Sequence, residues 1–254
     1  MKHFSIFLFL SLLLHSDSFA FEKWKPARIK DKDGYVYVRK GAGQGFEVVG
    51  KILSDEFFYC LPSDSDWWRI NDESGLEGYM HRSRIVLLEN LSVSDKKKLF
   101  LKIFREEQQL ADSSIVIYNA RGNSKWESES DSLRLHKAYL KFASFQDKKF
   151  VPVIRVFPMY FCDTKDSTLM NLCLSILWAN PGSANETIGT VLGKCFYCNP
   201  DLIIRMIKRR PREEYHEFLD MIEVGLELTI PYFEKSTDPR VVAARNKLNE
   251  LNSK

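Results

Sequence analysis

The five cysteines of this chain are the residues whose types and spacing come closest to a recognisable chemistry. They are Cys60, Cys162, Cys173, Cys195 and Cys198. The Cys195-x-x-Cys198 spacing suits a redox pair or half of a zinc site, but a redox pair needs a thioredoxin-like context and zinc needs two more ligands. Neither lies nearby in the sequence, so we expect helical cysteines that pack as small hydrophobic residues. Formation of a disulfide in an oxidising compartment is the alternative interpretation. The number of cysteines is odd, and the sequence does not assign the partners.

A hydrolase would need a nucleophile, a nearby base and an orienting group. His81 falls in a strand pattern, whereas His136 and His216 fall on polar faces of helical patterns, where solvation is the simpler interpretation. A glycosidase would need two facing carboxyl groups, and nothing in the context of Glu186 or Glu223 singles either out. We therefore expect no enzyme, no catalytic residue, no cofactor and no metal site.

The charge of the chain is only mildly positive, at +3. Its short basic runs, at 96–98 and 208–210, lie in helical patterns beside apolar positions and are typical of solvated helix faces. Nucleic-acid binding requires a concentrated basic face. We therefore expect no nucleic-acid partner.

Residues 1–20 have the pattern of a signal peptide. Lys2 precedes an apolar run at 4–14, and Ser18-Phe19-Ala20 supplies the small residues that precede cleavage. The apolar run is shorter than the ~20 residues of a membrane-spanning helix, and no cysteine follows it to carry a lipid. We expect a periplasmic or secreted protein without a membrane anchor.

Two segments follow the predicted signal peptide, and their hydrophobic patterns differ. Between 21 and 90, β-branched and aromatic residues alternate with glycine-containing turns, which predicts short antiparallel strands. The expected strands are 35–39, 46–52, 56–61, 67–71, 78–81 and 85–88, after a lead-in segment or first strand at 21–29. The loop 41–45 contains three glycines, which we interpret as allowing positive φ.

From 91 to 254 the apolar residues recur at helical spacing. Helices are expected over 92–110, 133–145, 167–179 and 241–251, and helix starts at Asn180-Pro181, Asn199-Pro200 and Asp238-Pro239. The pattern is ambiguous at 113–118. We expect a loop or the edge of a functional surface at 119–132. The apolar stretch 150–161 is either a strand or a broken helix, because it contains Pro152 and Pro158. Short connections between helices favour an antiparallel helical array.

The segment 34–85 resembles the bacterial SH3-like domain. The resemblance rests on Gly34-Tyr35-Val36-Tyr37-Val38-Arg39-Lys40-Gly41-Ala42-Gly43, on Trp67-Trp68-Arg69-Ile70, and on Gly78-Tyr79-Met80-His81-Arg82-Ser83-Arg84-Ile85. The chain departs from the usual pattern at Tyr37, Ala42 and Tyr79, where that family typically has Asn, Pro and Trp. The departures at 37 and 42 affect a loop that often borders the ligand groove.

The resemblance implies a small SH3-like β-barrel at 21–90, and with the helical spacing from 91 to 254 we expect an α+β protein in which this barrel precedes a mainly α-helical domain. The expected barrel interior consists of Val36, Val38, Val49, Ile52, Phe58 and Ile70. The candidate ligand-binding residues are Tyr35, Tyr37, Arg39, Trp67, Trp68, Tyr79 and Arg82, with one of the two tryptophans facing outward. Packing of these aromatic residues against the helical domain is the alternative interpretation.

Exposed aromatic rings suit peptides and sugars, and Arg39, Arg82 and Arg84 suit the carboxylates of a cell-wall stem peptide. We therefore expect an exported, non-catalytic binding protein that docks a peptide, a peptidoglycan fragment or a partner protein. Two alternatives remain at this point: a periplasmic inhibitor or immunity protein against a cell-wall hydrolase, and an unrecognised hydrolase. The sequence does not set the oligomeric state.

Overall fold

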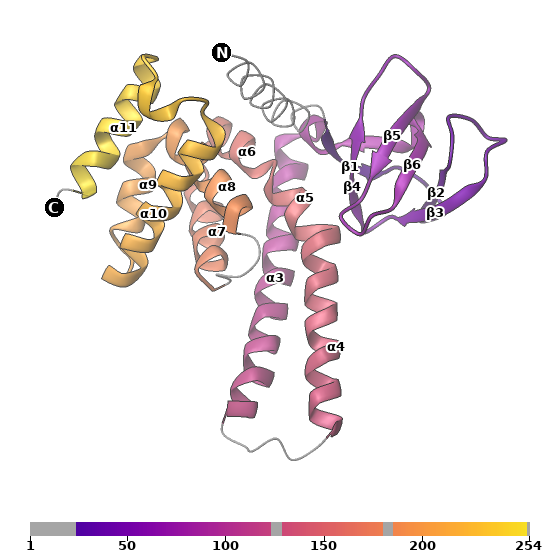
Figure 1. Ribbon diagram of the computed structural model, residues 1–254, viewed down its shortest axis with the longest axis horizontal. Coiled ribbons are helices and arrows are strands. Elements are labelled where there is room, and N and C mark those ends of the chain that lie inside the picture. Colours follow the sequence, from indigo (N-terminus) through magenta and orange to yellow (C-terminus); the bar gives the residue numbers. More distant parts are fainter. Residues whose placement is uncertain (1–23, 123–128, 180–184, 253–254) are drawn as a thin grey trace, which may run out of the picture. The chain divides into compact units, whose positions relative to one another are not determined.

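The computed structural model describes residues 24–122, 129–179 and 185–252. The predicted signal peptide at 1–20 and the predicted helix start at Asn180-Pro181 lie outside these residues. The chain divides into two compact units, one ending at Leu91 and one beginning at Ser92. The described residues of the first form strands and short 3₁₀ turns, and those of the second form helices (Figure 1). The N-terminal strand region and the helical region after it agree with the predicted order of the α+β chain.

The first unit, called the β unit below, is one antiparallel sheet with the strand order β3-β2-β6-β5-β4-β1-β7. Its strands are β1 (Lys25–Ile29), β2 (Tyr35–Arg39), β3 (Val48–Leu53), β4 (Phe57–Leu61), β5 (Trp67–Asn71), β6 (Glu77–His81) and β7 (Ile85–Leu87). A 3₁₀ turn, η2 (Arg82–Arg84), leads into β7, and a second, η3 (Leu88–Asn90), follows it. The predicted 3₁₀ turn at 82–84 is confirmed.

The sheet is not a closed barrel, so the prediction of closure is wrong. In the described ladder, β3 and β7 lie at opposite ends of the strand order. At the end of β3, the backbone N–H of Leu53 donates to Glu56 Oε2 at 3.0 Å, and the Leu53 carbonyl accepts from the Glu56 N–H at 3.1 Å. These bonds occupy the groups that another strand would need there. At the other end of the order, β7 is only three residues long.

A bulge in the β2–β3 ladder explains a second difference from the expected interior. Val38 pairs with Gly50, but Arg39 pairs with Val48, so the register shifts and Val49 becomes the extra residue. Val49 is 41% exposed rather than interior. The other expected interior residues are confirmed: Val38, Ile52, Phe58 and Ile70 lie in the core of the β unit, and Val36 is partly buried against it. The core also contains Ala27, Ile29, Cys60 and Met80.

A tight turn joins β5 to β6 and fixes their register. The Asp72 carboxylate accepts hydrogen bonds from the backbone N–H groups of Ser74 and Leu76 at 2.9 and 2.8 Å. Gly75 supplies the positive φ of +88° that this turn requires. The paired strands then hold alternate side chains of β5 and β6 on the same face.

The second unit, called the helical unit below, begins with two long antiparallel helices that lie side by side (Figure 1). Its elements are α3 (Val93–Gly122), α4 (Glu129–Phe145), the π-helical turn η4 (Gln146–Phe150), α5 (Val151–Ile154), α6 (Phe157–Thr164), α7 (Ser167–Ala179), α8 (Asn185–Cys198), α9 (Pro200–Ile207), α10 (Arg212–Thr229), η5 (Phe233–Lys235) and α11 (Pro239–Asn252). The ambiguous stretch 113–118 is helical, and 150–161 is a helix broken between α5 and α6. The predicted loop at 119–132 is helical at 119–122 and 129–132, and its middle lies outside the described residues.

Two predicted helix starts are confirmed by their capping bonds. The Asn199 side chain accepts a hydrogen bond from the Leu202 N–H at 3.1 Å, and Pro200 occupies the first helical position of α9. The Asp238 carboxylate accepts from the Arg240 N–H at 2.8 Å at the start of α11. Capping residues in the sequence therefore located the starts of these two helices.

Three glycines allow α8 and α10 to pack backbone against backbone. A Cβ atom added at Gly225 of α10 would lie 1.7 Å from the carbonyl oxygen of Gly189 on α8. A Cβ atom added at Gly193 would lie 2.5 Å from the carbonyl carbon of Gly225. Any side chain at these positions would therefore push the two helices apart.

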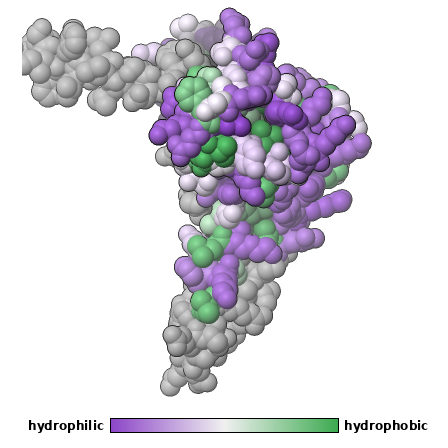
Figure 2. Space-filling model, turned by 90° about the vertical axis from the view of Figure 1, so that its right-hand side faces the viewer, coloured by the Kyte–Doolittle hydropathy of each residue, from purple (hydrophilic) through white to green (hydrophobic). Residues whose placement is uncertain are grey.

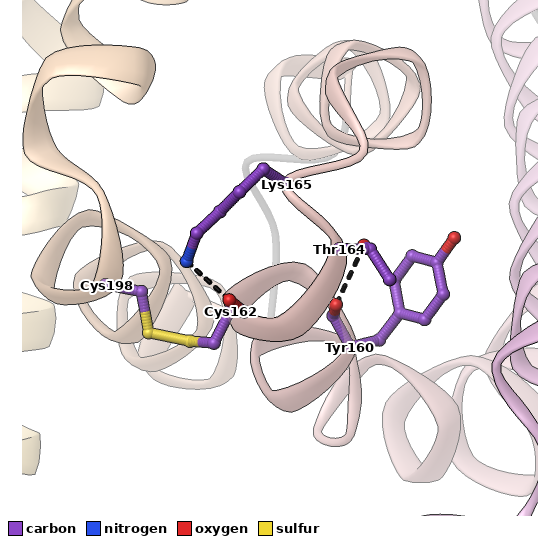
Figure 3. The surroundings of a disulfide bond; sticks show 5 residues. All are labelled: Tyr160, Cys162, Thr164, Lys165 and Cys198. Atoms are coloured by element: carbon purple, nitrogen blue, oxygen red, sulfur yellow. Dashed lines mark hydrogen bonds between the residues drawn. A yellow bond between two sulfur atoms is a disulfide. The ribbon is translucent and has the colours of Figure 1, made fainter.

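A disulfide joins Cys162 of α6 to Cys198 at the end of α8 (Figure 3). Their Cα atoms are 5.4 Å apart, which suits a disulfide. The interpretation of Cys162 and Cys198 as packed thiols is therefore wrong, whereas Cys60, Cys173 and Cys195 are free and buried as expected. Beside the bridge, Lys165 ends α6 in the left-handed conformation, and its ammonium donates to the Cys162 carbonyl (Figure 3).

Within the part of the chain that the structure describes, no helix combines the length and the apolar character needed to cross a membrane.

Candidate ligand-binding surface

Alternate residues of β2, β5 and β6 form one face of the sheet, which we call the outer face. The residues between them point inward, because Val38, Ile70 and Met80 are completely buried in the core. Strand alternation then places the following side chains on the outer face: Tyr35, Tyr37 and Arg39 from β2, Trp67 and Arg69 from β5, and Tyr79 and His81 from β6.

The strand register puts Tyr79 between two arginines. Arg39 of β2 pairs with Tyr79 of β6, and Tyr79 pairs in turn with Arg69 of β5. Directly opposite residues on neighbouring strands share a face and lie close enough for their side chains to interact. The outer face therefore carries a cross-strand row of cation, aromatic ring and cation.

Trp67 and His81 form a second row beside the first. They are a cross-strand pair, and their ring centroids lie 5.4 Å apart with the rings nearly perpendicular. This edge-to-face contact is a favourable arrangement for two aromatic rings. It holds Trp67 on the outer face while leaving the indole partly exposed.

Two tyrosines extend the surface along β2. The rings of Tyr35 and Tyr37 lie 5.2 Å apart in an edge-to-face contact, and Tyr37 is 47% exposed. The hydrogen bond between the two side chains is the largest of several causes that raise the pKa of Tyr35. Lys51 of β3 pairs with Tyr37, and its ammonium lies 5.6 Å from the centre of the Tyr35 ring. The surface is thus aromatic with a cation at its β3 side.

The loop that follows β2 positions Arg39. The guanidinium Nη1 of Arg39 donates to the Phe46 carbonyl at 2.8 Å. The Phe46 ring lies against Gly41, where an added Cβ atom would come within 2.5 Å of it. Gly41 is therefore a glycine because the Phe46 ring packs against its backbone, and not because it has a positive φ. The glycines with a positive φ in this unit are Gly34 and Gly75. The expectation of positive φ in this loop is wrong.

Three other arginines of the β unit are already engaged by carboxylates. Arg69 Nη2 lies 3.0 Å from Glu77 Oε2, and Arg82 Nη2 lies 2.9 Å from Asp66 Oδ1. Arg84 forms an ion pair with Asp31. These pairs reduce the charge available to a ligand, and the two pairs exposed on both sides, those of Arg69 and Arg82, each contribute only about 0–1 kcal/mol to stability.

The structure therefore brings together five of the predicted residues, Tyr35, Tyr37, Arg39, Trp67 and Tyr79. It places Trp68 elsewhere, because that side chain packs against the core and its Nε1 donates to the Ser63 carbonyl at 2.9 Å. Arg82 lies in η2 with its guanidinium on Asp66.

Sequence reasoning missed four contributors to this surface. Arg69 follows Trp67 by two residues, so strand alternation was a sufficient signal for it, and the same holds for His81 after Tyr79. Lys51 and Trp24 carried no such signal, because they reach the surface from other segments. The Trp24 ring lies 5.8 Å from the Arg69 guanidinium.

Figure 2 shows the molecule from the right-hand side of the Figure 1 view, where Figure 1 draws β2 and β3. Pale residues of intermediate hydropathy and green hydrophobic residues gather there within a purple, hydrophilic surround. On the outer face, the exposed ring of Tyr37 and the partly exposed rings of Tyr35, Trp67 and Tyr79 each join an apolar ring to one polar group. These side chains suit a ligand that has both apolar and polar parts.

The free thiols do not have the environment of a nucleophile. Burial raises the pKa of Cys60 to about 12, with a further contribution from the Glu89 charge. Burial also raises the pKa values of Cys173 and Cys195. A reactive cysteine needs a lowered pKa and some exposure. Across the described residues, no group of three or more His, Cys, Asp or Glu side chains is arranged to hold a metal ion.

Comparison with known proteins identifies one part of the chain. Residues 34–86 match the family model of the bacterial SH3 domain, which confirms the resemblance seen in the sequence. The match runs from β2 into β7 and includes the outer-face residues of β2, β5 and β6, and the rest of the chain is unrecognised. Neither the curated proteins nor the solved structures contain a match to this chain.

Proposed function

We propose that this chain is an exported, non-catalytic binding protein that attaches to peptidoglycan through the outer face of its β unit. The observation that carries the proposal is the cluster of partly exposed rings around Tyr37 and Tyr79, with Arg39 between them, inside the segment that matches the bacterial SH3 domain. Such domains are typically cell-wall or peptide binders. Flat aromatic faces combined with a few hydrogen-bond donors suit both the sugars and the peptides of the cell wall.

Two features support export. The first twenty residues have the charge, apolar run and small residues of a signal peptide. The Cys162–Cys198 disulfide supports the same location, because such bonds persist mainly in oxidising compartments. The periplasm or the cell exterior provides that environment, and both give access to the cell wall.

The burial of the thiols supports binding without catalysis. A hydrolase of the cysteine–histidine type would need a thiolate close to a base, and the free cysteines Cys60, Cys173 and Cys195 are all buried with raised pKa values. The described histidines lie on β6, α4 and α10, and His81 is engaged with Trp67 and Ser83.

Co-sedimentation with purified peptidoglycan sacculi tests the proposal. The full chain is expected to sediment with the sacculi, and Tyr37→Ala is expected to weaken binding at least fivefold. Tyr232→Ala is the matched control, because Tyr232 is 77% exposed but belongs to the helical unit. Equal binding by the Tyr37 and Tyr232 variants would contradict the proposal, as would failure of the wild-type chain to sediment. Lysis of the sacculi would contradict its non-catalytic part.

A further inference from the structure

We infer that the ligand of the outer face carries a carboxylate, and that the Arg39 guanidinium binds it. In the cell wall this group belongs to the stem peptides and not to the uncharged parts of the glycan. The inference rests on the proposed function and specifies its substrate class. It starts from a difference between Arg39 and three other arginines of the β unit, Arg69, Arg82 and Arg84.

Arg39 differs from Arg69, Arg82 and Arg84 in the chemistry of its partner. Those three arginines are each paired with a carboxylate of the chain. The hydrogen bond that the structure gives Arg39 goes to a neutral group, the Phe46 carbonyl. Among these four residues, Arg39 therefore retains its positive charge uncompensated by an acid.

The bond to Phe46 also prepares Arg39 for a ligand. It uses Nη1 and so fixes the orientation of the planar guanidinium, while the Nη2 and Nε donors remain for another acceptor. Carboxylates and phosphates both match two parallel donors of a guanidinium, and the carboxylate is the one of these groups that the stem peptides supply. Holding the side chain in advance lowers the entropy lost when a ligand binds.

The surroundings of Arg39 favour an anion that is attached to a peptide. Tyr79 lies opposite Arg39 in the ladder, and Tyr37 lies two residues earlier on the same face. Lys51, which pairs with Tyr37, adds a second positive charge on this side of the sheet, and no described carboxylate forms an ion pair with it. A peptide chain can rest on the rings while its carboxylate reaches the guanidinium.

Binding to chemically modified sacculi tests the inference. Carbodiimide-coupled amidation converts the carboxyl groups of the stem peptides to neutral amides and leaves the glycan strands in place. Wild-type protein is expected to bind native sacculi at least tenfold more tightly than amidated sacculi. Arg39→Gln is expected to bind both preparations equally weakly, and Arg39→Lys is expected to recover part of the preference.

Arg82→Gln is the matched control, because it removes the same charge from an arginine that is already paired with Asp66. It is expected to keep the wild-type preference, which distinguishes a specific contact from general attraction between opposite charges. Circular dichroism and thermal unfolding of each variant identify any loss of folding. Equal wild-type binding to native and amidated sacculi would overturn the carboxylate inference and leave the proposed function intact. Absence of binding to native sacculi would overturn both.

Discussion

Trp67 and Trp68 are neighbours in β5, yet their side chains lie on opposite faces of the sheet. Trp67 pairs with His81 and meets its ring edge-on at 5.4 Å on the outer face. Trp68 pairs with the completely buried Met80 and packs against the core. We therefore expect Trp67 to contribute to ligand binding and Trp68 to contribute to stability.

Trp67→Ala is expected to weaken binding to sacculi with little effect on stability, because it removes a ring from the exposed face. Trp68→Ala is expected to lower the free energy of unfolding by about 2–4 kcal/mol, because it removes a large side chain from the core boundary and leaves a cavity. Urea unfolding and co-sedimentation of both variants make the comparison. The reverse pattern, with Trp67→Ala the less stable variant, would contradict the assignment of the faces.

Loss of the Cys162–Cys198 bridge is expected to destabilise the helical unit. The bridge spans 36 residues, and its loss frees that loop in the unfolded chain, which corresponds to about 3–4 kcal/mol. The Cys162→Ser, Cys198→Ser double variant is compared with wild type by denaturant unfolding followed by far-UV circular dichroism. Cys173→Ala serves as a control for a buried cysteine outside the bridge. Unchanged stability of the double variant, with the bridge shown by mass spectrometry in the wild type, would refute this prediction.

Gly225→Ala is expected to lower the free energy of unfolding by about 2–3 kcal/mol. The added methyl group would meet the Gly189 backbone at 1.7 Å, and backbone atoms cannot move aside as a flexible side chain can. This cost outweighs the roughly 1 kcal/mol by which alanine favours an isolated helix. Gly45→Ala is the control, since an added Cβ there meets no atom within 4 Å. Thermal unfolding of both variants tests the expectation, which fails if Gly225→Ala is as stable as wild type.

The buried carboxyl group of Glu107 predicts a pH dependence of stability. Burial raises its pKa from 4.5 to about 7, although a hydrogen bond from Gln146 acts in the opposite direction. The folded chain therefore binds this proton more tightly than the unfolded chain does. Below about pH 4.5 the carboxyl group is protonated in both states, and Glu107 makes its whole contribution to the free energy of unfolding. As the pH rises from there to about 7, the free energy of unfolding falls by up to about 3 kcal/mol.

Glu107→Gln keeps the shape of the side chain and removes its charge. The variant is expected to lack this loss of stability between about pH 4.5 and 7 and to be more stable than wild type above that range. Glu106→Gln is the control, because Glu106 forms a partly exposed ion pair with Lys149 at 3.4 Å. Urea unfolding across this pH range measures the effect. Parallel pH profiles of wild type and Glu107→Gln would contradict the buried, proton-binding role.

The strands and most helices were predictable because their signals are local. Alternation of side chains located β2, β5 and β6, and capping residues such as Asn199 located helix starts. Five of the seven predicted ligand residues lie together for the same reason, since two-residue spacing places them on one face. Trp68 was the ambiguous member, because the sequence does not tell which of two adjacent tryptophans points inward.

The remaining features depend on contacts between distant segments. The bulge that exposes Val49 arises from the pairing of β3 with β2, and the open sheet is a property of the whole strand order, in which β3 and β7 lie at opposite ends. The Cys162–Cys198 pairing requires α6 and α8 to lie together, and five cysteines allow many other pairs. The close approach of Gly225 to Gly189 likewise follows from packing of α10 on α8, which no local pattern determines.

The most direct test of the account is to map the binding surface on the full chain. Nuclear magnetic resonance spectra of isotope-labelled protein are recorded during titration with soluble muropeptides that carry free carboxyl groups. The account predicts the largest shifts at Tyr37, Arg39 and Tyr79, with no comparable change in the helical unit. Shifts confined to the helical unit, or no shifts at all, would contradict the claim that the outer face of the sheet binds the cell wall.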